Sequence, residues 1–593
     1  MSQIDAHKHD SDNLHKIRHS AEHVLTQAMY QLYGNDKFYM AMGPATDDGF
    51  YFDFEPLNSF KISEEDFPKI EAEMTKIIKE NLPIIREEIT LDQAKELFKD
   101  NPYKLEWLDS IKDRNEIISI YKTADAFVDL CAGPHLAKTG EIKAFKLLSV
   151  AGAYWHGDEK NKMLTRIYGT AFESQKNLDQ FLWQIEEAKK RDHRKIGKEL
   201  DLFSFHPEAP ADVFWHNKGY IIMREMFTYW RQIHEREGYQ EVRTPEILSN
   251  DLWQQSGHLK SFSQKMYKVS TPDSKEWNMS IKPMNCDGGI LIYKSNPKSY
   301  RDFPLKVGEL GIVHRYESSG EVHGIIRPRE FTQDDAHIYC TPDQVKEEIK
   351  KVMDLCFEIY NTYGLKLDHL ELSTRPQNSI GSDEVWEKAE SIMRQILTEG
   401  NTPYQINEGD GAFYGPKFDF HLKDCVGRTW QCSTIQLDFA QPQNFNLEYT
   451  AEDGTKQQPV MIHRVLYGSV ERFLGIVIEN CAGAFPLWLS PLQAKIIPIT
   501  DAQHQYANKI LSELKEQGIR AEIDDRSEKM QAKIRDAQMK KVPYMLIIGN
   551  REVESNSVSV RQRDGQDLGA IPFVEFLAKV KEQINTRSLN LIK

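Results

Sequence analysis

The sequence predicts a multidomain protein of mixed α and β structure, and three observations support this fold class. The chain has 593 residues, which corresponds to roughly three to five domains at about 150 residues each. Hydrophobic residues make up 40% and charged residues 28% of the chain, a composition typical of globular proteins. Stretches with helical apolar spacing are interspersed with strand-like apolar runs along the chain.

The composition also bears on compartment and partners. Seven cysteines without a C-x-x-C pair predict reduced thiols in the cytoplasm. The polar N-terminus lacks the apolar stretch of a secretory signal, and no run approaches about 18 apolar residues, so we expect no membrane helix. The net charge of −15 disfavours nucleic-acid binding, but residues 491–593 carry 17 Lys and Arg against 14 Asp and Glu. This asymmetry permits a nucleic-acid partner.

The first predicted elements lie near the N-terminus. Residues 12–33 carry apolar side chains at helical spacing, which predicts a helix with one apolar side. Turn signals at residues 43–49 precede a strand-like run at 50–54. A charged stretch at residues 177–198 predicts a connecting helix at a domain boundary.

We expect a first domain at residues 1–176, a connecting segment at 177–205 and a larger domain at 206–490. The larger domain mixes a long helix, at about 218–237, with strands such as 429–439.

The last segment, residues 491–593, is predicted to form a small three-layer α/β domain, because strand-like runs alternate in it with helical stretches. The strand-like runs are at 495–499, 520–523 and 544–548, and the helical stretches are at 502–517 and 528–540.

Two motifs near the N-terminus concentrate histidine and cysteine. His19 and His23 are four residues apart and therefore share one face of the predicted helix. Asp129, Cys131 and His135 surround a Gly-Pro turn. Such a set suits either zinc binding or a hydrolytic pocket that orients water. The alternative is a group of unrelated surface histidines with one buried cysteine, and the residues alone leave these interpretations open.

Other candidates cannot be assigned from the residues alone. Cys286, His337 and His463 are too far apart in sequence for a local zinc pattern, and each also suits a core position. Arginines gather around turn residues at 314–331, where they suit phosphate binding or a solvated basic hairpin. Arg472 has the same ambiguity on a helix-like segment. The sequence contains neither a Walker A motif nor G-x-G-x-x-G, so a P-loop or dinucleotide fold has no support.

Together these stretches resemble a class II aminoacyl-tRNA synthetase, and most closely the threonyl-tRNA synthetase family. Residues 238–245 resemble motif 1, residues 314–331 resemble motif 2 and residues 468–472 resemble motif 3. Five further stretches match threonyl-specific signals: KPMNC at 282–286, FTQDDAH at 331–337, GAFYGP at 411–416, WQCSTIQ at 430–436 and MIH at 461–463.

The resemblance covers nearly the whole chain. The front, with AGAYW at 151–155 and RIYGT at 166–170, resembles the family's editing domain, and the tail, with VPYML at 542–546, resembles its anticodon-binding domain. The implied fold is α+β: a catalytic core with a class II antiparallel sheet at 206–490, preceded by an α+β editing domain at 1–176 and followed by an α/β anticodon-binding domain.

The chain departs from the family pattern in three places. It starts too close to His19 to contain the small ubiquitin-like domain with which many members begin. Asp287, Gly288 and Gly289 stand where the family continues Pro-Gly-His, and Glu330 occupies a glycine position of motif 2. The last two departures adjoin the expected substrate pocket and bear on its loop shape.

The resemblance implies that Cys286, His337 and His463 hold one Zn²⁺ with an open position for threonine. A site that requires a hydroxyl group rejects valine by about 10⁴–10⁵, whereas serine lacks only a methyl group, worth about 1–3 kcal/mol. Hydrolytic editing of seryl-tRNA is therefore also implied. We expect that editing pocket to be metal-free, although its ligand set is compatible with zinc.

The resemblance also implies that Arg315, Arg327 and Arg472 stabilise the charge that develops when the threonine carboxylate attacks ATP, with Mg²⁺ neutralising the rest. The implied partners are ATP, L-threonine, threonine tRNA and a second copy of the chain, bound through motif 1. The remaining implied contacts are Glu317 and Gln436 for ATP; Asp335, Tyr414, Gln431 and Thr434 for threonine; His19, His23, Lys104, Asp129, Cys131 and His135 for editing; and Glu554 and Arg563 for the anticodon.

Two other functions compete with this hypothesis. A sister class II enzyme for proline or serine would not need the cysteine and two histidines. A non-catalytic tRNA-binding or regulatory paralogue would not need the three arginines, but the atypical residues after Cys286 are compatible with it.

Overall fold

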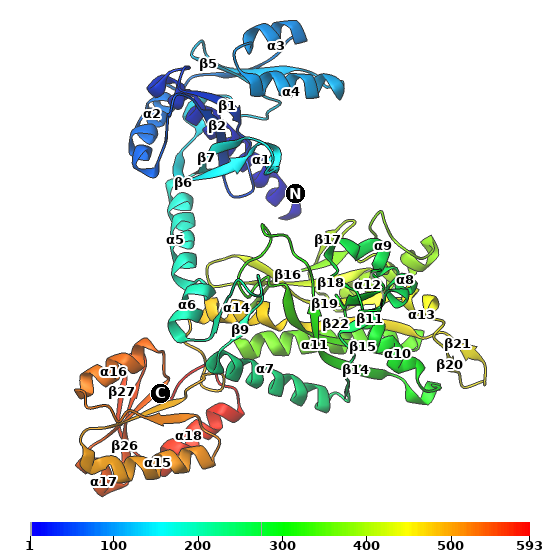
Figure 1. Cartoon of the computed structure of the whole chain (residues 1–593), viewed down its shortest axis with the longest axis vertical. Coiled ribbons are helices and arrows are strands. Elements are labelled where there is room, and N and C mark those ends of the chain that lie inside the picture. Colours follow the sequence, from blue (N-terminus) through cyan, green and yellow to red (C-terminus); the bar gives the residue numbers. More distant parts are fainter. Residues whose placement is uncertain (1–2, 274–275, 593) are drawn as a thin grey trace. The chain divides into compact units, whose positions relative to one another are not determined.

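The computed structural model describes residues 3–273 and 276–592, and the chain divides into two units, Met1–Glu186 and Glu187–Lys593 (Figure 1). In the described residues, no helix is long and apolar enough to cross a membrane. Each unit has its own sheets and its own apolar cores.

In its described residues, the first unit contains two antiparallel sheets and four α-helices that lie wholly within it. One sheet has the strand order β1-β2-β7-β6 and the other β3-β4-β5. The strands are β1 (Phe38–Met42), β2 (Phe50–Pro56), β3 (Ile84–Glu88), β4 (Ser119–Thr123), β5 (Phe127–Leu130), β6 (Ala144–Tyr154) and β7 (Met163–Phe172). The helices are α1 (Gln3–Tyr33), α2 (Phe67–Glu80), α3 (Leu91–Leu97) and α4 (Pro102–Asp113).

The apolar side predicted for the first helix is buried. Ile17, Ala21 and Val24 of α1 pack in one core with Phe52 and Phe54 of β2. The alternate phenylalanines of β2 point to the same face of the sheet, as the two-residue period of a strand requires. The helix is longer than predicted, because it begins at Gln3 rather than at residue 12.

The predicted connecting helix is in fact two helices, α5 (Gln175–Arg191) and α6 (His193–Leu200). Asp192 has non-helical backbone angles, and its side chain accepts a hydrogen bond from the Arg194 amide, so it caps α6. His193 Nδ1 lies 2.7 Å from Glu479 Oε1, a contact that spans 286 residues. This distant partner explains why the pattern of local charges did not predict the break.

The second unit is dominated by an eight-stranded sheet with the order β10-β14-β15-β22-β19-β18-β16-β17. Only its two outermost pairs, β10 with β14 and β16 with β17, are parallel, and the inner pairs are antiparallel. The strands are β10 (Gln240–Glu241), β14 (Leu305–His314), β15 (Glu330–Cys340), β16 (Lys366–Ser373), β17 (Gln405–Asn407), β18 (Lys417–Lys423), β19 (Thr429–Asp438) and β22 (Val460–Ser469). The antiparallel core sheet is thus as predicted.

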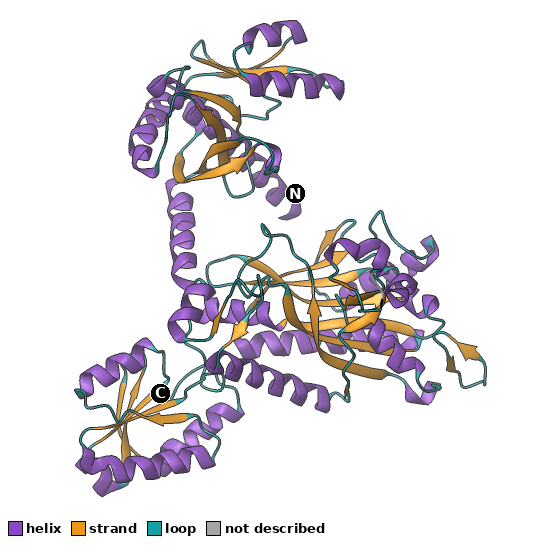
Figure 2. Cartoon of the chain, in the orientation of Figure 1, coloured by secondary structure: helices purple, strands orange, loops and turns teal. Residues whose placement is uncertain are grey.

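Long helices pack on one face of this sheet (Figure 2), and the site opens on the opposite face. Apolar residues of α6 and of four longer helices share a core with the inward-facing side chains of β16, β18, β19 and β22. The helices are α7 (Asn217–Arg236), α11 (Val345–Tyr363), α12 (Asp383–Glu399) and α14 (Val470–Cys481).

The tail has a five-stranded sheet of order β24-β23-β25-β26-β27 with helices on both faces. Ile496 packs with α15 and α18, whereas its neighbour Ile497 packs with α16. This alternation confirms the three-layer domain. The strands are β23 (Ala494–Pro498), β24 (Ala521–Ile523), β25 (Tyr544–Ile548), β26 (Ser557–Gln562) and β27 (Asp567–Pro572), and the helices are α15 (His504–Glu516), α16 (Met530–Met539), α17 (Asn550–Ser555) and α18 (Phe573–Asn585).

Candidate active site

Two cavities of about 200 and 240 Å³ open on the face of the large sheet opposite the long helices. Arg315, Gln333 and Thr434 line both cavities. One cavity is otherwise rich in arginine and the other in groups suited to a small polar ligand. The shared residues make the two cavities adjoining parts of one site.

Three predicted arginines, Arg315, Arg327 and Arg472, line the first cavity together with Glu317. Burial lowers the pKa of both Arg315 and Arg472, but their ordinary pKa is so high that both remain charged. The guanidinium of Arg327 donates to Glu317 and to Glu321, at 3.0 and 2.8 Å. Three half-buried guanidinium groups lining one cavity suit the oxygens of a polyphosphate.

The turn that presents Arg472 depends on glycine. Gly468 has a φ of +83°, and a Cβ at this position would lie 2.5 Å from the carbonyl oxygen of Cys432. The next residue, Ser469, caps α14 by accepting a hydrogen bond from the Arg472 amide. The sharp passage from β22 into α14 therefore fixes the start of the helix and, with it, Arg472.

The second cavity contains Asp335 and Tyr414, Gln431 lines the first cavity, and Thr434 lines both; Gln436, which was predicted as an ATP contact, lines only the second cavity. The predicted contacts to threonine are thus divided between two adjoining cavities. Burial raises the pKa of Asp335 to about 6.

Two side chains of this region, the buried Asp419 and the partly buried Gln333, were missed by the sequence interpretation. Asp419 of β18 accepts hydrogen bonds from Gln431 Nε2 at 2.6 Å and Thr434 Oγ1 at 2.9 Å, and so holds both predicted contact residues. Gln333 lines both cavities, and its Oε1 is buried without a hydrogen-bond partner. The signal for Gln333 was its two-residue spacing from Asp335 along a strand.

The predicted zinc ligands come from three elements. Cys286 begins α10 (Cys286–Lys294), while His337 on β15 and His463 on β22 are direct cross-strand partners with ring centroids 5.0 Å apart. Cys286 and His463 line the second cavity. In the described part of the chain, several groups of side chains have possible metal-ligand atoms that all lie within 4.8 Å of one another. The three predicted zinc ligands do not form such a group.

The contacts of these side chains nevertheless fit a metal ion. His337 Nε2 is buried and has no hydrogen-bond partner. His463 Nε2 lies 2.8 Å from Asp438 Oδ2. This contact orients the ring and leaves Nδ1 as the nitrogen that can bind a metal ion. The departure from the family pattern places Asp287 at this site, because its Oδ1 lies 3.3 Å from Cys286 Sγ.

A second site lies in the first unit, where the structure brings the predicted editing residues together. Cys131 Sγ lies 3.3 Å from His19 Nε2 and 3.2 Å from His135 Nε2, and the rings of His23 and His135 are 4.1 Å apart. The donor atoms of all four lie within 4.8 Å of one another. His19, His23 and Cys131 line a cavity of about 340 Å³.

The charges of this second site are set by burial. Burial lowers the pKa of His19 to about 4 and that of His135 to about 2, and it raises the pKa of Cys131 to about 12. All three groups are therefore neutral at pH 7. Lys104 and Asp129, which also line the cavity, form a buried ion pair at 2.7 Å.

The two predicted anticodon residues lie on different elements of the tail. Glu554 is exposed on α17, whereas Arg563 follows β26 and donates from NH1 to the carbonyl oxygen of Phe485 at 2.6 Å. No contact described in the structure joins the two side chains. Arg563 is thus engaged with the chain segment that precedes the tail.

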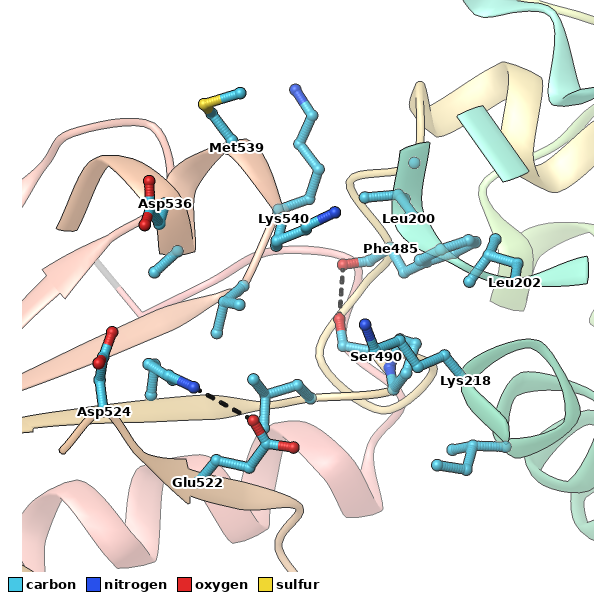
Figure 3. A pocket seen from close by; sticks show the side chains of 18 of the residues that line it. Leu200, Leu202, Lys218, Phe485, Ser490, Glu522, Asp524, Asp536, Met539 and Lys540 are labelled. Atoms are coloured by element: carbon cyan, nitrogen blue, oxygen red, sulfur yellow. Dashed lines mark hydrogen bonds and ion pairs between the residues drawn. The ribbon is translucent and has the colours of Figure 1, made fainter. Parts of the chain in front are cut away.

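Another cavity, of about 420 Å³, lies where this segment meets the tail sheet (Figure 3). Its walls include Leu200, Phe485 and Met539, and the ion pair between Lys495 and Glu522, on neighbouring strands of the tail sheet, forms part of one wall. None of the predicted site residues lines it. The predicted chemistry is therefore concentrated in the other cavities.

Family models match three parts of the chain. Residues 267–481 match the tRNA synthetase class II core domain (G, H, P, S and T), and residues 493–583 match an anticodon binding domain. Residues 118–168 match the threonyl and alanyl tRNA synthetase second additional domain. With the antiparallel sheet and its arginine-lined cavity, these matches define a class II aminoacyl-tRNA synthetase.

Individual relatives identify the family within the class II aminoacyl-tRNA synthetases. The chain is 53% identical over 580 residues to a threonine–tRNA ligase of Clostridium tetani, covering 98% of this chain and 89% of that relative. It is 54% identical over 574 residues to a threonine–tRNA ligase of Clostridium botulinum strain Langeland, covering 96% and 89%. The chain belongs to the threonine–tRNA ligase family.

Solved structures agree with this assignment. A structure titled as the RNA binding domain of threonyl-tRNA synthetase from Cryptosporidium parvum is 37% identical with a TM-score of 0.64, covering 66% of this chain and 98% of that one. A putative threonyl-tRNA synthetase from Aeropyrum pernix is 29% identical with a TM-score of 0.58, covering 67% and 96%.

Proposed function

We propose that this threonine–tRNA ligase selects its amino acid with a zinc ion held by Cys286, His337 and His463. The observation that carries the proposal is the unpartnered, buried Nε2 of His337, opposite His463 in the register and beside the cavity that Cys286 lines. When bound, the ion would supply an open Lewis-acid position for the amine and hydroxyl of threonine. Valine offers no hydroxyl and would be rejected.

We propose that the residues of the two cavities position threonine and ATP for adenylate formation. A carboxylate oxygen of threonine attacks the α-phosphorus of ATP, and the bond to the bridging oxygen breaks, so pyrophosphate leaves with the electron pair. We propose that Arg315 contacts the α-phosphate, and its position on the border of both cavities supports this role. Arg327 and Arg472 neutralise further phosphate charge, alongside Mg²⁺ carried by ATP.

In the second step a hydroxyl oxygen of the terminal tRNA ribose attacks the carbonyl carbon of the adenylate and AMP leaves. Asp419 acts as a positioning residue throughout, because it holds Gln431 and Thr434. We propose Glu317 and Gln436 as ATP contacts, and Asp335, Tyr414, Gln431 and Thr434 as threonine contacts.

We propose that the first unit hydrolyses seryl-tRNA in a metal-free pocket. Water would attack the ester carbonyl, which releases serine and the ribose hydroxyl. His19 is neutral at pH 7 and is the stronger base of the two histidines that contact Cys131, so we assign it the proton from water, and Lys104 supplies charge next to Asp129. Burial raises the pKa of Cys131 to about 12, so its side chain is a neutral thiol in the metal-free pocket.

We propose that each domain has one function. Residues 1–176 carry out editing, residues 177–205 form a connecting segment, residues 206–490 carry out catalysis and residues 491–593 bind the anticodon. Glu554 and Arg563 would read the anticodon, which requires Arg563 to leave the Phe485 carbonyl. Two chains would associate through residues 238–245, and light scattering of the purified chain tests that association.

Pyrophosphate exchange with threonine, valine, proline and serine tests the function as a whole. We expect strong exchange with threonine, weaker exchange with serine and almost none with valine or proline. Exchange with proline or serine alone would select a sister enzyme, and no exchange with any amino acid would select a non-catalytic paralogue.

A further inference from the structure

A cluster of two histidines and a glutamate lies at the edge of the large sheet, outside both cavities of the candidate active site. His369 and Glu371 belong to β16, and His421 belongs to the neighbouring β18, where it is the register partner of His369. The two imidazole rings are stacked, with centroids 4.4 Å apart and planes within 7°. One donor atom from each of the three side chains lies within 4.8 Å of the others.

Both histidines approach the same carboxylate. His369 Nε2 lies 3.1 Å from Glu371 Oε1, and His421 Nε2 lies 3.3 Å from Glu371 Oε2. Zinc–nitrogen and zinc–oxygen bonds are about 2.0–2.2 Å, so two ligands of one tetrahedral ion lie about 3.3 Å apart. The separations within the cluster therefore match those of ligands that share an ion.

His421 supplies the sharpest observation. Its Nε2 is buried and has no hydrogen-bond partner, although the carboxylate oxygen of Glu371 is only 3.3 Å away. The two atoms are close without the directional geometry of a hydrogen bond. That relationship is expected of two groups that point at a common third atom.

The outer contacts of the cluster are also those of a metal site. His369 Nδ1 lies 3.0 Å from Asp368 Oδ2, which fixes the ring and directs Nε2 toward Glu371. Asn407 of β17 donates to Glu371 Oε2 at 2.9 Å. Histidine ligands commonly have a carboxylate on the other ring nitrogen, and carboxylate ligands are commonly hydrogen-bonded in turn.

We propose that His369, Glu371 and His421 bind a divalent transition-metal ion, Zn²⁺ or a close analogue, at a site separate from the catalytic zinc. Two imidazoles and a carboxylate suit zinc, copper and nickel better than magnesium or calcium. The side chains are 17–23% exposed, so the ion can enter from solvent.

The ion would join the outer strands next to the active site. Alternation along β16 and β18 places the cluster on the sheet face opposite the buried Leu370 and Phe420. Ser373 and Asp419 lie further along the same two strands and face, and Ser373 donates to Asp419 at 2.8 Å. A metal ion bound by the cluster would link β16 to β18 and so make this strand pair, which carries Asp419, more rigid.

Zinc titration of the metal-stripped full chain against a colorimetric chelator tests this proposal. We compare wild type with the double variant His369→Ala/His421→Ala and with Glu371→Gln, which keeps the shape of the side chain. His504→Ala, a partly exposed histidine on α15, is the matched control. The readout is the difference between chains, so it does not depend on whether the catalytic zinc is bound.

The double variant should bind one equivalent of zinc fewer per chain than wild type, Glu371→Gln should bind that equivalent at least tenfold more weakly, and His504→Ala should match wild type. With Co²⁺, the double variant should keep any thiolate-to-cobalt absorption from Cys286 and lose the bands of a site with nitrogen and oxygen ligands. Equal stoichiometry in wild type and a folded double variant would overturn the proposal. If the double variant does not fold, unchanged zinc affinity in Glu371→Gln would overturn it.

Discussion

Nε2 of His463 lies 2.8 Å from Oδ2 of Asp438, and the carboxylate of Asp438 is completely buried. The other oxygen of the carboxylate accepts hydrogen bonds from the backbone amides of Ala440 and Gln441. Asp438 is thereby fixed by its own backbone and in turn fixes the imidazole ring. This arrangement makes Asp438 the positioning residue of the proposed zinc site.

Asp438→Asn should weaken zinc retention and threonine activation by about 10- to 100-fold, because it removes the charge that orients His463 but keeps an oxygen for the two amides. Zinc content and pyrophosphate exchange measure the two effects. Asp453→Asn, in an exposed turn, is the control. Full zinc content in the Asp438 variant would contradict the positioning role.

Cys286→Ala should lower bound zinc and threonine activation together, and more severely than Asp438→Asn, because it removes a ligand rather than its support. Elemental analysis and pyrophosphate exchange are performed on the same preparation. The exposed Cys425→Ala serves as the control. Normal activation by zinc-free Cys286→Ala protein would refute a role for the metal.

His19→Ala combined with Cys131→Ala should leave threonine activation intact and slow the hydrolysis of seryl-tRNA by about 100-fold or more, since the pocket loses its groups for proton transfer. Deacylation of preformed seryl-tRNA measures this effect. His156→Ala changes a half-exposed histidine of the same unit and should have no effect. Zinc content equal to wild type in the double variant would support the metal-free pocket.

The first unit should lose stability as the pH falls from about 6.5 toward 4. Burial holds the pKa of His135 at about 2, so the unfolded chain takes up a proton in this window while the folded chain does not. Each such histidine contributes a slope of about 1.4 kcal/mol per pH unit. His135→Asn should therefore show a smaller fall in Tm between pH 7 and pH 5 than wild type. An identical fall in both proteins would contradict the buried neutral state.

Gly468→Ala should destabilise the turn before α14 by about 1–3 kcal/mol and lower ATP-dependent activation, since the added Cβ meets the Cys432 carbonyl and displaces Arg472. Gly454→Ala is a close control: its φ is +84°, but nothing lies within 4 Å of the added Cβ. Thermal melting and the KM for ATP separate the effects. If both variants lost stability and activation to a similar extent, the effect would come from the positive φ and not from the contact with Cys432.

The sequence predicted those parts of the fold that depend on local periodicity. The apolar side of α1 and the three layers of the tail follow from spacing that can be read within one element. The break at Asp192 was missed because it is stabilised by Glu479, far away in the chain.

The candidate site shows the same limit. Spacing alone could not group His337 with His463, because they meet through cross-strand register rather than through a local motif, and only the resemblance joined them. Asp419 was not predicted because its role depends on the hydrogen bonds that it accepts from Gln431 and Thr434, which only the structure shows.

The common wall formed by Arg315, Gln333 and Thr434 has an energetic consequence. A ligand that orders these side chains in one compartment leaves less ordering to be done by the occupant of the other. By thermodynamic reciprocity, bound threonine would raise the affinity for nucleotide by the same factor by which bound nucleotide raises the affinity for threonine.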